Sequence, residues 1–296
     1  MDRRTFIAST LAASALGMAR FGHARPLRAP RGIRMSLKYG MIGVGDTIEQ
    51  KFAAARNAGF DGVELDSPND LDRTDVLDAK KATGIAIPGV VGSRHWSHPL
   101  SSPDASVREA GLAALEQGIR DCKAYGGSTV LLVPAVVNSE VGYDEAYRRS
   151  QEEIRKVLPL AEQSGARVAI ENVWNNFLMS PMEAARYIDE FESDAIGWYF
   201  DVGNIVNYGY PAQWARILGN RILKIDVKGF SRSKRDNEGL WKGFGVEIGE
   251  DDCDWPKVMH ELDNIGYTGW ASAEVGGGGA DRLADIARRM RAVLDS

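Results

Sequence analysis

The sequence predicts an α/β fold, a single-domain (β/α)8 barrel preceded by an export signal. From Lys38 onward, apolar strand-like segments alternate with helix-like segments over roughly 260 residues, the count and length typical of such a barrel. No linker or shift in composition divides this part of the chain. Four successive strand candidates end in an acidic residue, at what would be the active face of a barrel. A doubly wound parallel sheet is the alternative.

The expected elements follow in chain order. Strands are expected at 39–45, 62–67, 86–92, 129–134, 167–173, 196–204, 222–230 and 269–275. Helices are expected at 47–58, 74–83, 106–125, 144–164, 181–191, 211–218, 255–265 and 281–294. A long loop that contains His95, Trp96 and His98 separates the third strand from the next helix.

The amino terminus has the pattern of a twin-arginine export signal. Arg3 and Arg4 precede an apolar, Ala-rich run, and Gly22-His23-Ala24 offers a small-x-small cleavage site. The run of about 14 residues is shorter than the roughly 20 that a membrane span needs. The expected organisation is a signal peptide at 1–24, a linker at 25–37 and the barrel at 38–296, with the mature protein in the periplasm. An uncleaved amphipathic helix or a chance arginine pair is the alternative.

Composition limits the classes of partner. The chain has 296 residues, of which 44% are hydrophobic and 26% charged, and its formal net charge is -5. Without a basic block, a nucleic-acid partner held by its phosphates is not expected. Cys122 and Cys253 have no CxxC or CxxH companion, so two unpaired thiols are expected and a zinc-thiolate site is excluded.

The acids at the strand ends predict a metal site. They are Glu171, Asp201, Asp226 and Glu274. Each lies in or beside apolar strand sequence, where ionised side chains are rare unless paired or bound to a metal. A divalent cation would relieve their mutual repulsion, and ligation by oxygen alone favours Mn, Mg or Ca over Zn or Cu. The alternative is that acids fall at these positions by chance.

The chain from about Lys38 to its end resembles the xylose isomerase-like TIM-barrel superfamily of sugar isomerases and epimerases, which includes ketose 3-epimerases, hydroxypyruvate isomerase and endonuclease IV. The resemblance lies in I-E-N after the fifth strand, F-D-V-G-N at the sixth, A-E-V at Glu274, and L-W-K-G-F-G-V-E-I-G-E followed by D-W. It implies a divalent metal cofactor, Mn, Mg or Co, held by Glu171, Asp201 and Glu274, with Glu171 and Glu274 also transferring protons. It implies substrate contacts from Asn204 and Arg232.

Four positions depart from the family pattern. Asp226 stands where the family usually has a histidine ligand, and Gly229 replaces an aspartate of the same motif. Phe177 stands where ketose 3-epimerases have a further glutamate. Asn204 occupies the place of a histidine in many members. An aspartate in place of histidine keeps a ligand but favours harder ions.

Other residues are candidates for substrate binding. His95 and His98 could bind substrate or serve as an acid or base, or be satisfied loop residues. Trp174, with Trp241 and Phe244, could pack on the apolar face of a sugar or belong to the core. Glu64 could be a polar anchor that points inward or a buried structural acid, and Lys228 could bind substrate oxygens or offset the acids.

The leading prediction is a metal-dependent isomerase or epimerase of a free sugar or keto-sugar. Its carboxylates would move a proton through a metal-bound enediolate. One alternative is a lyase or hydrolase that cleaves 3-keto-glycosides by β-elimination, and another is a non-catalytic periplasmic sugar-binding protein. The expected partner is a small carbohydrate, without nucleic acid or a membrane span in the mature form, and a homo-oligomer is compatible with the sequence.

Overall fold

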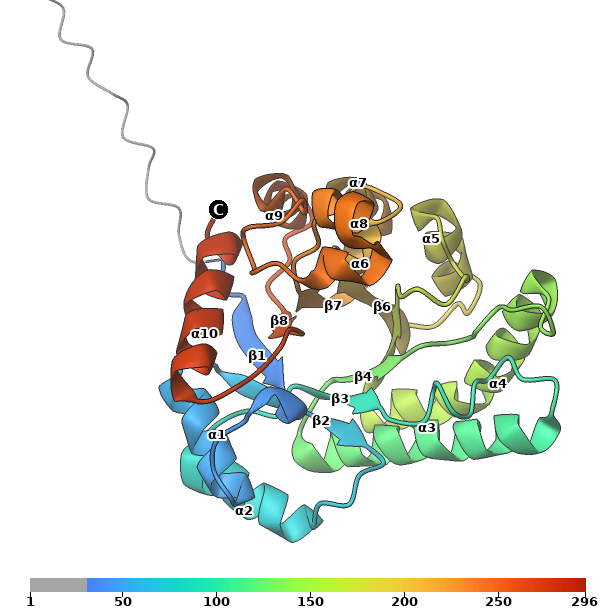
Figure 1. Cartoon of the computed structure of the whole chain (residues 1–296). Helices are drawn as coiled ribbons and strands as arrows, with labels where there is room; N and C mark the ends of the chain where they lie inside the picture. The colour runs from blue at the N-terminus through green and yellow to red at the C-terminus, as the bar shows by residue number, and fades with distance from the viewer. Residues whose placement is uncertain (1–30) are drawn as a thin grey trace, which may run out of the picture.

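Eight parallel strands close into a barrel in the order β1 to β8, with β8 pairing back to β1 (Figure 1). The computed structural model describes residues 31–296, so the predicted signal at 1–24 and the first residues of the predicted linker lie outside the described part. Within residues 31–296, no helix combines the length and the apolar character that a membrane crossing requires. The predicted (β/α)8 barrel is confirmed.

The strands are short and lie close to the predicted positions, except the first. They are β1 (Arg34–Lys38), β2 (Gly62–Ser67), β3 (Gly89–Gly92), β4 (Thr129–Leu132), β5 (Arg167–Glu171), β6 (Ile196–Asp201), β7 (Ile222–Val227) and β8 (Trp270–Ala273). The α-helices are α1 (Ile48–Asn57), α2 (Arg73–Thr83), α3 (Ala105–Tyr125), α4 (Tyr143–Ser164), α5 (Pro181–Asp189), α6 (Val202–Val206), α7 (Pro211–Leu218), α8 (Arg232–Glu238), α9 (Trp255–Asn264) and α10 (Ala280–Leu294). The described part of the chain also has three 3-10 helices: η1 (Tyr39–Met41), η2 (Gly219–Arg221) and η3 (Leu240–Phe244).

The first strand lies earlier than predicted. The sequence analysis placed it at 39–45 and treated residues up to 37 as linker, and this placement is wrong. Met35 and Leu37 are buried in β1, and Ser36 pairs with Gly62 of β2. Residues 39–41 form η1 instead, and Gly45 has a φ of 91°, which is outside the range of a strand. The apolar content of 39–45 comes from packing against the barrel and not from pairing in it.

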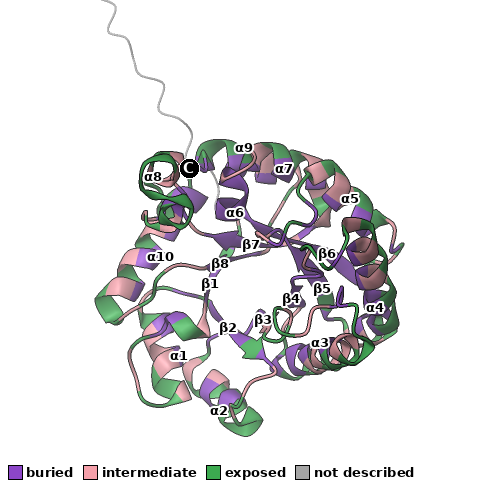
Figure 2. Ribbon diagram, turned by 45° about the vertical axis from the view of Figure 1, so that its right-hand side comes forward, coloured by how far each residue is buried: buried purple, intermediate pink, exposed green. Residues whose placement is uncertain are grey.

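The two faces of the barrel wall pack against different kinds of residue. Outside the strands, an apolar layer joins them to the ring of helices, whose buried surfaces face the barrel in Figure 2. Inside the barrel, by contrast, several buried residues are polar: Ser36, Glu64, Tyr199, Lys224, Asp226 and Ser272. Cys122 and Cys253 are both free and buried, which confirms the predicted unpaired thiols.

Three short helices that the sequence analysis did not predict follow the ends of β6 and β7. They are α6, α8 and η3. Figure 1 shows α6 and α8 beyond the ends of β6 and β7. In a barrel this is the face where active sites form, so these insertions shape the site.

Candidate active site

Four acids converge at the carboxyl ends of β5 to β8. Glu171 ends β5, Asp201 ends β6, Asp226 lies in β7 and Glu274 follows β8. One carboxylate oxygen from each lies within 4.8 Å of those of the other three. The predicted convergence is therefore confirmed, whereas the roles of these acids as ligands and proton carriers stay predictions.

Asparagines hold the ends of β5 and β6 in place. The Asn172 side chain donates to the Asp201 carbonyl oxygen at 2.7 Å and accepts from the Asp201 backbone N–H at 3.1 Å and from the Trp198 indole N–H at 2.9 Å. The Asp201 carboxylate caps α6 by accepting from the Asn204 backbone N–H at 2.8 Å. Asn204 in turn donates to the Asn172 carbonyl oxygen at 3.0 Å, and its side chain lies 3.5 Å from Glu171. Glu171 and Asp201 are thus held in place by the asparagines of the same I-E-N and D-V-G-N segments.

Lys228 brings a positive charge into the acid cluster. Its Nζ lies 2.8 Å from Asp201 Oδ2 and 2.6 Å from Glu274 Oε2. The aliphatic part of Lys228 packs on Gly203, where an added Cβ would lie 2.4 Å from Lys228 Cγ. The glycine of F-D-V-G-N is therefore required by the close approach of Lys228.

A second set of charges lies beneath the acids, inside the barrel. Glu64 pairs with Lys224, and its other oxygen lies 2.9 Å from Lys38 Nζ. Lys38 Nζ also lies 3.0 Å from Asp226 Oδ1. The Tyr199 hydroxyl contacts both Glu64, at 2.8 Å, and Asp226, at 3.1 Å. We call these five residues the barrel floor.

Burial and neighbouring charges push the carboxyl pKa values apart. Burial raises the pKa of Glu171 well above its ordinary value, and the charges of Glu274 and Asp201 raise it further. Burial also raises the pKa of Asp201, to about 6, against the opposing effect of Lys228. For Glu274, Lys228 and Lys38 outweigh the effect of burial, so its pKa is lowered. Two carboxyl groups with opposite shifts are typical of an acid and base pair.

The site fits a divalent cation. The barrel floor and acid cluster contain five carboxylates and three ammonium groups, which leaves two negative charges when all are ionised. Asp226 Oδ2 is buried and has no hydrogen-bond partner. Oxygen ligands alone suit hard ions such as Mg and Mn. Glu171, Asp201, Asp226 and Glu274 are therefore the residues that could hold the ion.

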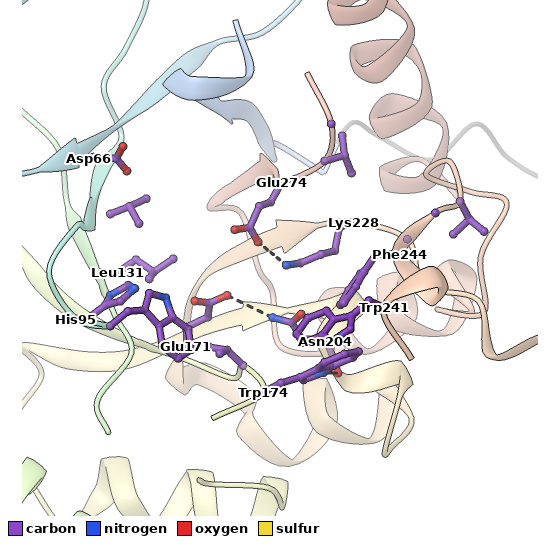
Figure 3. A pocket seen from close by; sticks show the side chains of 18 of the residues that line it. Asp66, His95, Leu131, Glu171, Trp174, Asn204, Lys228, Trp241, Phe244 and Glu274 are labelled. Carbon is purple, nitrogen blue, oxygen red and sulfur yellow. Dashed lines mark hydrogen bonds and ion pairs between the residues drawn. The ribbon is translucent and has the colours of Figure 1, made fainter. Parts of the chain in front are cut away.

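A cavity of about 980 Å³ opens above the acids. Its lining includes Glu171, Asn204, Lys228 and Glu274, together with His95 on another side, as Figure 3 shows. Ligand cavities of 300 to 1,000 Å³ are usual in enzymes. The acid cluster therefore opens onto a space that a small molecule can enter.

His95 is a neutral hydrogen-bonding group at this cavity. Burial lowers its pKa to about 4, although Glu274 opposes this. Its Nδ1 accepts from the Val133 backbone N–H at 3.3 Å. The remaining proton of the neutral ring must then lie on Nε2, which makes Nε2 a donor.

Aromatic rings form another wall of the cavity. Trp174 lies 4.9 Å from Trp241 and 4.9 Å from Phe244 between ring centroids. All three line the cavity, and we call them the aromatic wall (Figure 3). The Trp174 indole N–H donates to the Asn204 carbonyl oxygen at 2.9 Å, which fixes the wall beside the acids.

Three residues predicted to contact substrate do not line this cavity. Arg232 lies at the start of α8, donates to the Gly209 carbonyl oxygen at 2.9 Å and stacks over the Tyr210 ring at 5.1 Å. His98 bonds to Ser97 at 2.9 Å in the loop after β3. Glu64 is enclosed in the barrel floor with exposure of 1%. The substrate contacts of Arg232 and His98 stay predictions, and the burial of Glu64 agrees with the alternative of a buried structural acid.

The sequence analysis missed several residues of the site. Lys38, Tyr199 and Lys224 of the barrel floor lie within strand sequence, and Trp96 lines the cavity from the loop after β3. Charged residues at inward positions of strands are a usable signal, since Lys224 lies between apolar neighbours in I-L-K-I-D-V.

The fold is that of a known family of TIM-barrel proteins. The model of the xylose isomerase-like TIM barrel family matches residues 52–295, and the chain belongs to this family. This confirms the resemblance found in the sequence.

Among individual proteins, the chain is similar to L-ribulose-5-phosphate 3-epimerase UlaE of Escherichia coli O1:K1, with 24% identity over 237 residues, 76% of this chain and 81% of that protein. It is also similar in fold to an L-ribulose 3-epimerase, with a TM-score of 0.74, 17% identity and coverage of 89% of this chain and 95% of that one. The E. coli 3-keto-D-glucoside 4-epimerase YcjR superimposes with a TM-score of 0.72 at 16% identity, covering 88% of this chain and 98% of that one.

Proposed function

We propose that this protein is a divalent-metal-dependent isomerase or epimerase of an uncharged keto-sugar. The observation that carries the proposal is the meeting of four carboxylates within 4.8 Å at the base of an open cavity. Similar proteins are named for the epimerisation of sugars, which supports the same class of substrate here.

The carboxylates would carry out the proton transfers. The cation, Mn, Mg or Co, would polarise the sugar carbonyl and stabilise negative charge on its oxygen. Glu171 and Glu274 come from β5 and from the end of β8, so they approach the cavity from different strands. One removes the proton from the carbon next to the carbonyl, and the other returns a proton to the same carbon or to the former carbonyl carbon. The first outcome is epimerisation and the second is isomerisation.

Charges at the cavity favour a substrate without phosphate. Its cationic lining residues are Lys228, paired with Asp201 and Glu274, and Arg282, paired with Glu247 at 2.8 Å. Both cations are thus already neutralised by acids. Phosphate recognition normally uses arginine or lysine that is free to bind the phosphate oxygens.

Asn204 and His95 are the proposed polar contacts to the sugar. Asn204 is buried beside Glu171, and His95 presents its Nε2 donor from another wall. A neutral donor can bind a sugar hydroxyl or carbonyl oxygen without changing its charge over the physiological pH range.

The second candidate function is β-elimination from a 3-keto-glycoside. Phe177, which replaces a glutamate of ketose 3-epimerases, is buried against Tyr143, Tyr147 and Tyr187 and does not reach the cavity. The cavity therefore has no carboxylate at the position where ketose 3-epimerases have this further glutamate. In elimination, one carboxylate removes the proton beside the ketone and the other protonates the departing glycosidic oxygen, which gives an unsaturated keto-sugar and an alcohol.

Export to the periplasm through the twin-arginine route is part of the proposal and rests on the amino-terminal pattern. A non-catalytic sugar-binding protein would need the cavity and its aromatic wall. It would not need four converging acids, whose mutual repulsion costs stability.

The test is incubation of the protein with Mn, Mg or Co and a keto-sugar in deuterated water. Deuterium in carbon-bound positions is the expected result, with loss of exchange after chelation. Release of the alcohol from a 3-keto-glycoside would instead select elimination. Sugar binding without exchange or release, in protein whose metal content has been measured, would leave only the binding protein.

A further inference from the structure

We propose that the substrate is a keto-glycoside, with its reacting ring over the acid cluster and an uncharged second ring against Trp241. This inference rests on the proposed function and names the substrate class that the same site takes. The second ring is the glycosidic substituent, either another sugar or an aromatic group.

The cavity is larger than one sugar ring requires. Its volume of about 980 Å³ is close to the upper end of the 300 to 1,000 Å³ range that holds drug-sized ligands. A single hexose is much smaller than such a ligand, so a monosaccharide over the acids leaves space along the walls.

The space is bounded by exposed indole rings. Trp241 is 70% exposed and Trp96 is 53% exposed, and both line the cavity. Exposed aromatic rings that lie together along a cavity mark a binding surface, because covering them removes apolar area from water. In the view of Figure 3, the Trp241 ring lies beyond Trp174 and Asn204 as seen from Glu171.

The aromatic wall is held rigidly. η3 carries Trp241 and Phe244, and an added Cβ at Gly243 would lie 2.3 Å from the Phe230 ring. The Gly243 carbonyl oxygen also accepts from the Ser231 N–H at 2.8 Å. A preformed aromatic surface binds a ring at a low cost in conformational entropy.

The wall is continuous with the reacting centre. Lys228 Nζ lies 5.4 Å from the Phe244 ring centroid while it pairs with Asp201 and Glu274. Trp174 is bonded to Asn204, whose side chain lies beside Glu171. The wall thus runs from Trp241 through Trp174 to Asn204 beside Glu171, and we place the two linked rings along it.

The chemistry of a glycoside fixes where its carbonyl must be. The anomeric carbon of a glycoside is an acetal, so it cannot open to a ketose. A carbonyl that acidifies a neighbouring C–H must therefore be a ketone at another ring carbon, as in a 3-keto-glycoside. Proton removal and return at the adjacent carbon then need no oxidant or reductant.

The test compares three ligands by calorimetry on the metal-loaded protein: methyl 3-keto-β-D-glucoside, phenyl 3-keto-β-D-glucoside and 3-keto-cellobiose. We expect at least one ligand with a second ring to bind about ten-fold more tightly than the methyl glycoside. Trp241→Ala should remove this difference and leave methyl glycoside affinity unchanged. The phenyl and disaccharide results distinguish an aromatic substituent from a second sugar.

Leu240→Ala is the matched control, since Leu240 is on the same 3-10 helix but does not line the cavity, and it should keep the selectivity. Equal affinities in the wild type, or equal weakening of all three ligands in Trp241→Ala, would overturn the inference. So would a change of molar mass in Trp241→Ala with unchanged affinities, which would make Trp241 a contact between copies of the chain. Deuterium exchange into the methyl glycoside tests the proposed function separately, because exchange without selectivity overturns this inference alone.

Discussion

Charged residues are usually exposed in proteins and large apolar residues are usually buried. The barrel floor and the aromatic wall depart from this distribution in opposite ways. The floor buries charged groups, with Glu64 and Lys224 each 1% exposed. The wall exposes an apolar ring, with Trp241 70% exposed. Buried charges cost free energy unless paired, and exposed aromatic rings gain free energy when covered.

The difference indicates that the floor is stabilised by contacts within the folded chain, whereas the wall offers a surface for a ligand. The charges of the floor find their partners within the chain, except for Asp226 Oδ2 and the excess negative charge of the acids. In the wall, the Trp241 ring packs against Trp174, and most of the rest of its surface is exposed to solvent. Changes in the floor should therefore alter stability and catalysis, and changes in the wall should alter ligand selectivity.

The largest effect is expected at the acids themselves. Glu171→Gln and Glu274→Gln should each lower the rate of carbon-bound deuterium exchange by 10² to 10⁴, the usual contribution of a positioned acid or base. The measurement is the exchange rate of a keto-sugar followed by NMR in deuterated water with saturating metal.

Glu250→Gln provides the control for loss of a carboxylate. Glu250 pairs with Arg289 at 2.8 Å and does not line the cavity, so exchange should stay near the wild-type rate. A wild-type rate of deuterium exchange in Glu171→Gln would show that Glu171 does not transfer the proton.

The next effect is on stability and lies in the floor. Lys224→Met leaves Glu64 buried with one of its two cations and should lower the free energy of unfolding by about 3 kcal/mol. Urea denaturation of the variant and of the double variant Lys224→Met with Glu64→Gln measures the coupling. The double variant should recover part of the loss.

A pair whose lysine is exposed gives the comparison. Lys156 lies 2.6 Å from Glu153 but is 55% exposed, so Lys156→Met should cost about 1 kcal/mol or less. Similar losses for Lys224 and Lys156 would show that burial adds little to the pairing in the floor.

The floor also shows why sequence reasoning found the acids and missed their partners. Glu171, Asp201, Asp226 and Glu274 were identified because the ends of parallel strands meet at one face of a barrel, which requires only the strand order. The partnership of Lys38 with Asp226 depends instead on the register of β1 and on side-chain reach across the barrel. Neither quantity can be derived from one sequence.

Packing also explains two places where the structure differs from what the local sequence suggests. Arg232 follows β7 as a substrate-binding residue would, but α8 begins there and the Gly209 carbonyl and Tyr210 ring hold its side chain. Residues 39–45 have the apolar content of a strand, yet the chain turns into η1 after Lys38. For Arg232 and for residues 39–45, packing in the folded chain overrides the structure that the local sequence indicates.

A pH effect of intermediate size is expected at His95. Its pKa is about 4 in the folded chain and about 6.5 as an ordinary value, so both states are neutral above pH 6.5. As pH falls from 6.5 to 4, the unfolded chain binds the proton first, and stability should fall by about 2 kcal/mol after allowance for partial exposure. Midpoints of urea denaturation at several pH values measure this slope.

The matched comparison uses the two histidine positions. His95→Asn should reduce the loss of stability between pH 6.5 and 4, while His260→Gln, at an exposed position of α9, should keep the wild-type slope. An unchanged slope in His95→Asn would show that the buried imidazole does not set the acid sensitivity.

The smallest effect on stability is expected in the wall. Trp241→Ala removes a ring that is 70% exposed, so the free energy of unfolding should change by about 0.5 kcal/mol or less. Urea denaturation without ligand measures it. A loss above about 2 kcal/mol would mean that the ring stabilises the fold through Trp174, and its exposure would no longer indicate a missing ligand. A small loss of stability combined with altered ligand selectivity would show that the two regions have different roles. The buried charges of the floor would then stabilise the folded chain, and the exposed Trp241 ring of the wall would bind the ligand.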